Sequence, residues 1–448
     1  MLNRLANFFV RMVERWMPDP FLFCVLLTAL AYLLALALTP TGPAELVTHW
    51  YNGLWQILPF AMQMILILLT GYTLASSAPV RRLLARIASI PRTQGSAIVL
   101  LTVAAALAAL VHWGFALVAS ALLAKEIARK VPNCDFGFLV AGAYSGFVIW
   151  GSGLSSSIAL VSATAGSPMN FIARYTGVES VSLSQTLLSP MNIALVAGTL
   201  VILPVMFLLM MPRGQQIRAI DPALLSEAES ESLAAQPPDN PTPAQRLERS
   251  RLVLYLIVLL GGVFLVRHFA ANGFQLDLNV VILLFLVLGM ALHGRPVAYV
   301  RAFNQAARVA GPLALQYPLY GGIMGMMQQS GLAGVISQAF VSFSTQVTFP
   351  VYCFLSAALV NLFVPSGGGQ WAVQGPVMIP AAMELGVSPT VTAMAVAFGD
   401  QTTNMLQPFW ALPLLAIAGL NIRHIMGYCA MTFLLSTALS ILVLFLLA

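Results

Sequence analysis

The stretch Val364-Pro365-Ser366-Gly367-Gly368-Gly369-Gln370-Trp371 separates two apolar segments, 351–362 and 372–383. A helix of about 12 residues reaches about 18 Å, less than the hydrocarbon core of a membrane, which is about 30 Å thick. Proline ends the first segment, and three glycines leave backbone N–H groups uncovered where a new helix can begin. Because lipid cannot satisfy such backbone, the stretch predicts a re-entrant helical hairpin whose tip holds a ligand near the membrane middle. The alternative is a loop between two ordinary spans, and the short arms count against it.

The composition is that of a polytopic α-helical membrane protein. Of 448 residues, 59% are hydrophobic and only 8% are charged. The net charge of +6 is explained by basic residues on the cytoplasmic side of the spans, so it does not indicate a nucleic-acid partner. The four cysteines are scattered through apolar segments without metal-ligand spacing, so we interpret them as small hydrophobic residues.

Hydropathy predicts nine full spans and two hairpins. The predicted spans are 21–39, 58–77, 136–166, 190–211, 252–269, 277–293, 309–327, 389–420 and 425–447, and the hairpins are 96–124 and 349–383. With the N-terminus inside, nineteen of the 21 Lys and Arg residues fall on the cytoplasmic side, and only Arg174 and Arg267 fall outside. This bias supports the predicted topology.

The predicted organisation has five parts. They are an amphipathic cytoplasmic N-terminal helix (1–20), a first membrane repeat (21–211), a cytoplasmic linker (212–251), a connecting span (252–276) and a second, inverted membrane repeat (277–448). The linker is the one long polar stretch and contains a Pro-rich run at 237–243.

The two membrane halves resemble one another in sequence. PFAMQ at 59–63 matches PLALQ at 312–316, AALV at 108–111 matches AALV at 357–360, and Gly151 matches Gly399. Three matches in the same order predict an internal repeat. Because an extra span lies between the halves, the second half is expected to enter the membrane inverted, as in alternating-access carriers.

The repeat places a first hairpin tip at His112-Trp113-Gly114 and a broken span after each hairpin. The first broken span contains Gly151-Ser152-Gly153-Leu154-Ser155-Ser156-Ser157, and the second contains Gly399-Asp400-Gln401-Thr402-Thr403-Asn404. Isolated Ser and Thr residues are often no more than hydrogen-bonding contacts between helices. Two clusters at repeat-related places favour a binding site.

No Lys or Arg lies at the middle of a predicted span, so helix starts, hydroxyls and amides must bind any anionic substrate. The N–H groups at a helix start carry about half a positive charge and suit a carboxylate. The candidate substrate-binding residues are Ser366, Gly367, Gly368, Gly369, Gln370, Trp371, Trp113, Gly114, Ser155, Ser156 and Ser157. Trp113, Trp371 and Trp410 are candidates to enclose a short alkyl tail, although packing alone explains Trp410 equally well.

Asp400 is the only acidic residue predicted within the membrane interior. A carboxylate at a helix centre costs about 2.5–3.5 kcal/mol, which calls for a reason. One hypothesis is ion coupling, in which Asp400 carries a proton or binds Na⁺ together with Gln401, Thr402, Thr403 and Asn404. The other is that Asp400 caps a broken helix. No organic cofactor is expected, and Na⁺ is the only metal considered.

Five motifs resemble the bacterial short-chain fatty acid transporter family, which includes the acetoacetate and butyrate carrier. They are WMPDPF (16–21), GYTLASSAPV (71–80), HWGFALV (112–118), VPSGGGQWAVQGP (364–376) and QPFWALPLLAIAG (407–419). The family looks like part of the ion transporter superfamily, whose members pair hairpins with broken helices in inverted repeats, commonly as homodimers. Divalent anion symporters of that superfamily have a Ser-Asn-Thr motif at each tip, which this chain replaces with His-Trp-Gly and Ser-Gly-Gly-Gly.

The sequence therefore predicts an all-α inverted-repeat secondary transporter in the inner membrane of a bacterium. The expected substrate is a short-chain monocarboxylate such as acetoacetate or butyrate, moved with H⁺ or Na⁺, and a homodimer is implied by the resemblance. A dicarboxylate or amino-acid carrier is the first alternative, and a membrane-embedded enzyme or scaffold is the second. The enzyme is disfavoured because the sequence has no zinc-protease, serine-hydrolase or phosphate-loop motif.

Overall fold

The structure is a computed structural model, and it describes residues 20–212, 214, 217–221, 242–362, 364–407 and 409–448. Residues 1–19 of the predicted N-terminal helix (1–20) and most of the linker (212–251) lie outside these ranges.

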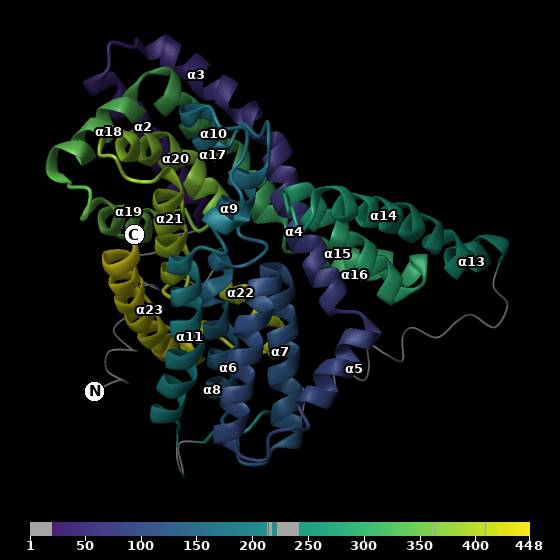
Figure 1. The fold of residues 1–448 in the computed structure, drawn as a ribbon. Helices are drawn as coiled ribbons and strands as arrows, with labels where there is room; N and C mark the ends of the chain where they lie inside the picture. The colour runs from purple at the N-terminus through teal and green to yellow at the C-terminus, as the bar shows by residue number, and fades with distance from the viewer. Residues whose placement is uncertain (1–19, 213, 215–216, 222–241, 363, 408) are drawn as a thin grey trace.

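All regular structure in the described ranges is helical, which confirms the predicted fold class (Figure 1). The first half contains α2 (Pro20–Leu38), α3 (Pro43–Gln56), α4 (Leu58–Ala75), α5 (Ala78–Ile87), α6 (Gln94–Val111), α7 (Trp113–Lys130), α8 (Phe136–Ser145), the 3₁₀ helix η1 (Gly146–Ser152), α9 (Ser157–Ala163), α10 (Phe171–Thr176), η2 (Leu183–Gln185) and α11 (Pro190–Leu209). The second contains α13 (Pro243–Glu248), α14 (Arg251–Asn272), α15 (Leu278–His293), α16 (Pro296–Ala307), α17 (Gly311–Gln329), α18 (Leu332–Phe343), α19 (Phe349–Asn361), α20 (Gly367–Glu384), α21 (Pro389–Thr403), α22 (Ala411–Ala418), η4 (Ile422–His424) and α23 (Met426–Leu447).

The order of elements repeats between the halves. In each half a long helix (α4 or α17) is followed by an amphipathic helix, a helical hairpin, a broken helix and a final long helix. The halves also pack crosswise, since α4 contacts α15 and α16 while α17 contacts α2 and α3. Two contacts join α4 to α15: Gln63 Nε2 donates to Asn279 Oδ1 at 2.8 Å, and His293 Nε2 lies 2.9 Å from Thr73 O. Such reciprocal packing is what two copies of one structural repeat produce.

Glycines allow the closest of these crosswise contacts. A Cβ atom on Gly321 of α17 would lie 2.6 Å from the backbone oxygen of Gly53 on α3, and one on Gly325 would lie 2.7 Å from Gly53 Cα. The backbones of α3 and α17 therefore touch without intervening side chains, as small residues permit at membrane helix interfaces.

Both predicted hairpins are present. Helices α6 and α7 lie side by side and join at His112, and α19 and α20 are separated by residues 362–366 (Figure 1). The contacts of the second pair run in opposite directions along its helices, from Gln370 with Ala357, through Gln374 with Ser356, to Met378 with Cys353. Residues 349–383 are therefore an antiparallel hairpin and not a continuous rod.

The two broken helices are also present, with one change of boundary. The predicted span 136–166 divides into α8, η1 and α9, with irregular backbone at 153–156. The predicted span 389–420 divides into α21 and α22, but the break falls after Thr403 rather than at residues 399–405. Gly399 and Asp400 are thus in the last turns of α21.

Four α-helices of ten or more residues were not predicted by hydropathy: α3, α5, α16 and α18. Each has only 10–14 residues, and each places polar or small residues on one side, so none resembles a membrane span. Three of them begin with proline in the first turn, which is the favoured helix position for that residue.

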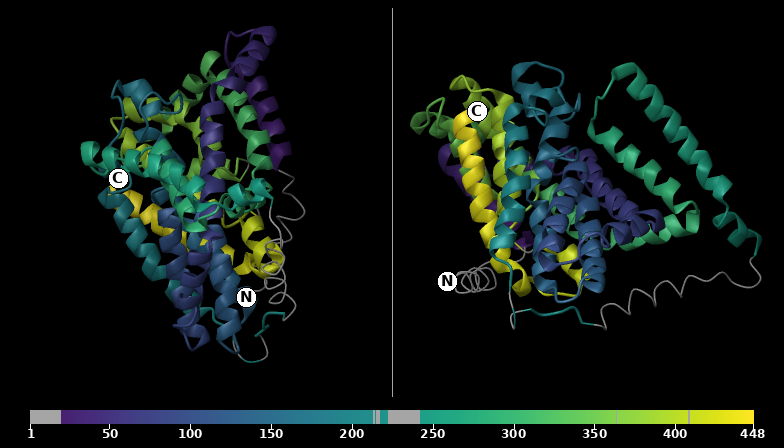
Figure 2. Two further views of the ribbon diagram at one scale, coloured as in Figure 1. Left: turned by 90° about the vertical axis from the view of Figure 1, so that its right-hand side faces the viewer. Right: turned by 60° about the horizontal axis from the view of Figure 1, so that its bottom comes forward.

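Six helical segments of the described ranges are long and apolar enough to cross a membrane, judged by length and composition. They begin at Leu58, Gln94, Phe136, Pro190, Arg251 and Met426. The segment in α14 is only 11% buried, and α14 packs mainly on α15, at the outside of the molecule (Figure 2). The many exposed apolar side chains of α14 fit a lipid environment.

Candidate functional site

At the first hairpin tip, side chains accept two backbone N–H groups. His112 is fully buried and caps α7, where its Nδ1 atom accepts the N–H of Phe115 at 3.3 Å. Ser155 Oγ, from the first broken helix, accepts the N–H of Trp113 at 2.8 Å. Gly114 allows the tip to lie against α4, because its Cβ position is 3.2 Å from Leu68 Cα. His112 therefore has a structural role, and the first turn of α7 already holds two acceptors.

The three consecutive serines of the first broken helix are all buried and have separate contacts. Ser155 binds the first tip, Ser156 caps α9 by accepting the N–H of Ala159 at 3.4 Å, and Ser157 Oγ lies 3.3 Å from Met64 Sδ. Each of the three hydroxyl groups is therefore held by a contact within the protein.

At the second tip, a side chain accepts only one of the first backbone N–H groups of α20. Ser366 caps α20, and its Oγ accepts the N–H of Gly369 at 3.4 Å and lies 2.7 Å from Tyr317 Oη on α17. No described side chain accepts the N–H of Gly367 or Gly368, which lie in the first turn of α20, where a helix has no internal acceptor. The three glycines pack tightly: Cβ positions on Gly368 and Gly369 would lie 2.5 Å from the rings of Phe60 and Tyr320 respectively.

Asp400 lies at this second tip. Its carboxylate oxygen Oδ2 is 3.1 Å from the Cβ position of Gly367, and the residue is 1% exposed. Its other oxygen, Oδ1, is buried and has no hydrogen-bond partner in the described part of the chain. Because Asp400 lies within α21 and its side chain accepts no helix N–H group there, the capping hypothesis is wrong.

The polar residues after Asp400 mostly stabilise the end of α21. Thr402 and Thr403 donate their hydroxyls to Gly399 O at 3.0 and 3.1 Å, and Gln401 Nε2 donates to Ser152 Oγ at 3.3 Å. The Asn404 oxygens also have donors, since Oδ1 accepts from Gln407 at 3.0 Å and the backbone oxygen accepts from Tyr144 at 2.7 Å. Gln401 and Asn404 thus bond α21 to the first half of the chain, and the hydroxyls of Thr402 and Thr403 donate within α21.

Asn361, at the end of α19, is a residue of this site that the sequence did not identify. Its Nδ2 atom donates to Asp400 O at 2.7 Å, to Thr403 Oγ1 at 2.8 Å and to Asn404 Oδ1 at 3.3 Å. Asn361 thereby fixes Asp400 relative to the second hairpin. The sequence feature that could have identified Asn361 is an amide side chain at the end of an apolar segment, immediately before the tip.

An aromatic cluster connects the two tips. It contains Trp113, Phe147, Trp150, Phe409 and Trp410, with ring centroids of neighbouring members 4.9–6.5 Å apart. Trp410 bridges the tips, because its indole N–H donates to Pro365 O at 2.8 Å and its ring packs edge-on against Trp113 at 5.1 Å. Trp150 was not identified from the sequence. The feature that could have identified it is an aromatic residue immediately before the Gly151-Ser152-Gly153 break.

Gln370 and Trp371 lie further along α20 and bind protein groups. Gln370 Nε2 donates to Ala357 O at 2.9 Å and to Gln374 Oε1 at 2.7 Å. The Trp371 N–H donates to Met169 O at 2.9 Å, and its ring packs against Phe171. In this conformation both side chains stabilise the hairpin, and neither forms a hydrogen bond with Asp400.

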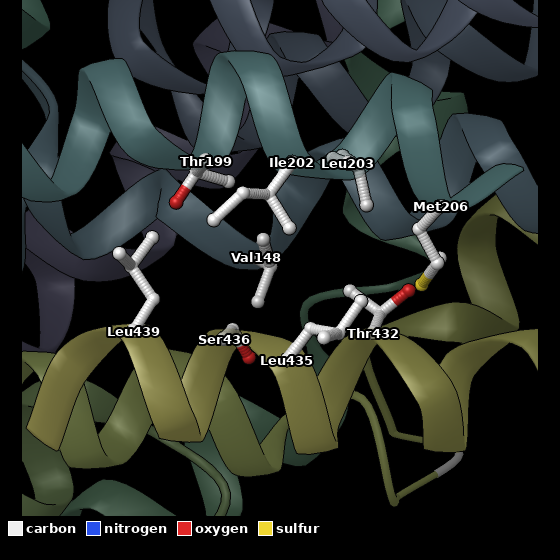
Figure 3. Close-up of a pocket in the computed structure, with 9 residues that line it drawn as sticks. All are labelled: Val148, Thr199, Ile202, Leu203, Met206, Thr432, Leu435, Ser436 and Leu439. Carbon is white, nitrogen blue, oxygen red and sulfur yellow. The ribbon is translucent and has the colours of Figure 1, made fainter. Parts of the chain in front are cut away.

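A separate crevice lies between α11 and α23 (Figure 3). Its lining residues are Val148, Thr199, Ile202, Leu203, Met206, Thr432, Leu435, Ser436 and Leu439. Each of its three hydroxyls donates within the protein: Thr199 to Leu195 O, Thr432 to Ser145 Oγ, and Ser436 to Phe433 O. The crevice offers an acid headgroup no free donor, so we do not assign the substrate to it.

Two broken helices, two hairpin tips and one unpaired buried carboxyl define a membrane transporter. No group of three or more His, Cys, Asp and Glu residues that could hold a metal ion occurs in the described ranges.

Comparisons with known proteins specify the family. The model of the family "Short chain fatty acid transporter" matches residues 1–447, and the chain belongs to that family. Relatives from Escherichia coli K12 and Haemophilus influenzae Rd, each named "Putative short-chain fatty acid transporter", are 44% and 42% identical. The alignments cover 97% and 98% of this chain and 98% of each relative. These proteins are transporters and not enzymes, which confirms that prediction.

Two solved structures share the fold. The Alcanivorax borkumensis YdaH transporter has a TM-score of 0.58 at 17% identity and covers 95% of this chain and 98% of its own. Neisseria gonorrhoeae MtrF, described as one of a class of antimetabolite efflux pumps, has a TM-score of 0.58 at 15% identity. The match covers 100% of this chain and 98% of MtrF. At these identities the likeness concerns the fold alone. Membership of the transporter family and the apolar helices make the chain a multi-pass membrane protein with a small-molecule substrate.

Proposed function

We propose that this protein is a secondary carrier that moves short-chain monocarboxylates, such as acetoacetate and butyrate, across a bacterial inner membrane together with protons. The observation that carries the proposal is the meeting of Asp400 with the start of α20 at Gly367. Family membership supports the substrate class.

The substrate carboxylate would bind the amides of Gly367 and Gly368. A helix start attracts an anion through its uncovered N–H groups and its dipole. In the first repeat the corresponding N–H, that of Trp113, is already occupied by Ser155 Oγ. At the second tip no described side chain accepts the N–H of Gly367, and a single carboxylate needs only a few donors.

Asp400 would couple this binding to an ion. An ionised Asp400 and an ionised substrate at the same helix start would repel one another strongly, because like charges a few ångströms apart in a low-dielectric site are costly. Anion binding would therefore require that Asp400 be neutralised first. The carrier would move one neutralising cation with each acid, by alternating access of the site to the two sides of the membrane.

A proton fits this role better than Na⁺. Sodium needs several oxygen ligands, but Thr403 Oγ1 already accepts a hydrogen bond from Asn361, and Asn404 Oδ1 accepts from Asn361 and Gln407. Asp400 Oδ1, which has no partner among the described residues, can be neutralised by a proton alone.

Uptake of labelled butyrate and acetoacetate into proteoliposomes tests the proposal. We expect accumulation under an inward proton gradient and little effect of an inward Na⁺ gradient at constant pH. Protein-free liposomes measure passive entry of the neutral acids and must be subtracted. Absence of protein-dependent uptake under either gradient would refute the function, and accumulation driven by Na⁺ alone would refute proton coupling.

Malate and alanine test the alternative substrate classes in the same vesicles. We expect neither to compete with butyrate, because no described Lys or Arg lies near the tips to bind a second carboxylate. Competition by either would favour the dicarboxylate or amino-acid carrier. A homodimer is a further proposal, which crosslinking in native membranes would test.

A further inference from the structure

An open cavity lies between α13 and α16, apart from the two hairpin tips. It is on the side of the molecule that carries α14 and α15, at the right of Figure 1. The cavity has a volume of about 620 Å³. Sites for small ligands commonly measure about 300–1,000 Å³, so this cavity is large enough to be one. The proposed transport function assigns no role to it.

The polar lining of the cavity comes mainly from one face of α16. Arg301, Asn304, Gln305 and Arg308 line it at positions i, i+3, i+4 and i+7, which fall on one side of a helix. The buried residues of α16 occupy other positions of the helix, and the helix packs on α4 and α15. All four polar residues are exposed, so this face can meet a ligand.

The charges of the lining suit an anion. Its cations are Arg301 and Arg308, and its acid is Glu248, the last residue of α13, which leaves one surplus positive charge. Within the described ranges neither arginine has an ion pair, because the two ion pairs there join other residues. A guanidinium group can donate two parallel hydrogen bonds to a phosphate, which makes the pair strong and directional. The cavity is therefore matched to a phosphate group that carries a single charge.

Apolar side chains adjoin these charges. Val297 and Val300 line the same cavity, and Val300 is exposed. Helix α14 begins at Arg251, three residues after Glu248, and its next residue, Leu252, is 82% exposed. Only 11% of this span is buried, as expected of a helix that faces lipid. A soluble anion would use the charges alone, whereas a phospholipid would use the charges for its phosphate and the apolar surface for its acyl chains.

We propose that this cavity binds the headgroup of an anionic phospholipid. The phosphate would bind Arg301 and Arg308, Asn304 and Gln305 would bond to the headgroup oxygens, and the acyl chains would lie along Val300 and the lipid-facing side of α14. Basic pockets beside membrane helices on the cytoplasmic side suit such headgroups, and the two arginines are on the side predicted to be cytoplasmic. The inference does not depend on the proposed function, because no group of the hairpin tips takes part.

Thermal unfolding of the purified full chain in an uncharged detergent tests the proposal. Added palmitoyl-oleoyl-phosphatidylglycerol should raise the melting temperature by a few degrees, because a ligand that binds only the folded state stabilises it. Phosphatidylethanolamine with the same acyl chains should have a smaller effect, since its ammonium group cancels the charge of its phosphate. The effect of phosphatidylglycerol should weaken at high salt, as expected for exposed charges.

The variant Arg301→Gln/Arg308→Gln removes both cations and leaves polar side chains. We expect a parental melting temperature without lipid, because both residues are exposed. Its apparent dissociation constant for phosphatidylglycerol should rise about tenfold or more, through the loss of charge-assisted hydrogen bonds. The matched control is Arg82→Gln/Arg86→Gln on α5, which removes the same charge from exposed positions outside the cavity. This control should bind phosphatidylglycerol as the parent does.

Parental affinity of Arg301→Gln/Arg308→Gln for phosphatidylglycerol, or an equal loss of affinity in the control variant, would overturn the inference. Equal stabilisation of the parent by the two lipids would also overturn it, and this comparison decides if the variant is not stable enough to measure. Inorganic phosphate is the remaining probe. Stabilisation of the parent by phosphate alone, abolished in Arg301→Gln/Arg308→Gln, would assign the cavity to a soluble anion and refute the phospholipid.

Discussion

The two hairpin tips occupy equivalent places in the two repeats but differ in how their backbone is satisfied. At the first tip, His112 and Ser155 accept the N–H groups of Phe115 and Trp113. At the second tip, Ser366 accepts only that of Gly369, while Gly367 faces Asp400 and Trp150. The difference teaches that side chains accept two first-turn N–H groups at the first tip and only one at the second, where we propose that the acid headgroup binds.

The largest effect should come from Asp400→Asn, which would break the contrast between the tips by removing the ionisable group from the second one. Asparagine resembles a neutralised aspartate, so the substrate should still bind and exchange. Accumulation of butyrate driven by a proton gradient should be abolished. Uptake and counterflow in proteoliposomes measure the two activities. Equal accumulation by mutant and parent would return Asp400 to a structural role.

Gly367→Ala should have the next largest effect. Its Cβ atom would lie 2.7 Å from Trp150 Cη2 and 3.1 Å from Asp400 Oδ2, so it would fill the space assigned to the carboxylate. Overpacking of about 1–3 kcal/mol predicts that half-saturation rises about tenfold or more. The matched control is Gly262→Ala on α14, where no atom lies within 4 Å of the Cβ position, and its uptake should be parental. Equal kinetics for both variants would count against the site.

Ser155→Ala tests the first tip. The substitution leaves the N–H of Trp113 buried without its acceptor, which should cost about 1–3 kcal/mol of stability. We therefore expect a lower melting temperature of the purified protein, with a few-fold loss of uptake per folded molecule at most. Ser342→Ala, at an exposed position, should not change the melting temperature. A large loss of butyrate affinity in a protein of parental stability would show that the first tip also binds substrate.

The smallest effect should come from Ser436→Ala in the crevice between α11 and α23. Its hydroxyl donates to Phe433 O in its own helix, and no acid headgroup is assigned there. Half-saturation and maximal uptake should both stay within about twofold of the parental values, as is usual for substitutions away from a site. A substantial change in half-saturation would move the substrate out of the tips and into the crevice.

Much of the fold could be predicted from local sequence. Pro365 and the three glycines place the break of the second hairpin, and long apolar runs locate α2, α4, α11, α14 and α23. The amphipathic helices α3, α5, α16 and α18 were missed because their polar residues make them unlike spans. The break in the second broken helix was placed too early, since Gly399 and Asp400 continue α21 despite their low helix propensity.

The candidate site could be predicted only in part. Asp400, Ser366 and Gly367 were found because a charge, a cap and a glycine run are unusual in apolar sequence. Thr402 and Thr403 are predicted to bind an ion, and what the sequence did not indicate is that their hydroxyls donate to the preceding turn of their own helix. Asn361, Trp150 and Tyr317 were missed, because nothing local distinguishes them from ordinary amide and aromatic residues of membrane helices.

By itself, the sequence determined an all-helical membrane chain with two interrupted hairpins and one interior carboxyl, because hydropathy and the conformational limits of proline and glycine act over a few neighbouring residues. Only the tertiary structure decided which backbone N–H groups of the two tips are accepted by side chains. That outcome depends on contacts between positions far apart in the chain, such as Ser155 with Trp113, and Trp150 and Asp400 with Gly367. Side-chain orientation in a packed interior, and not local propensity, sets those contacts.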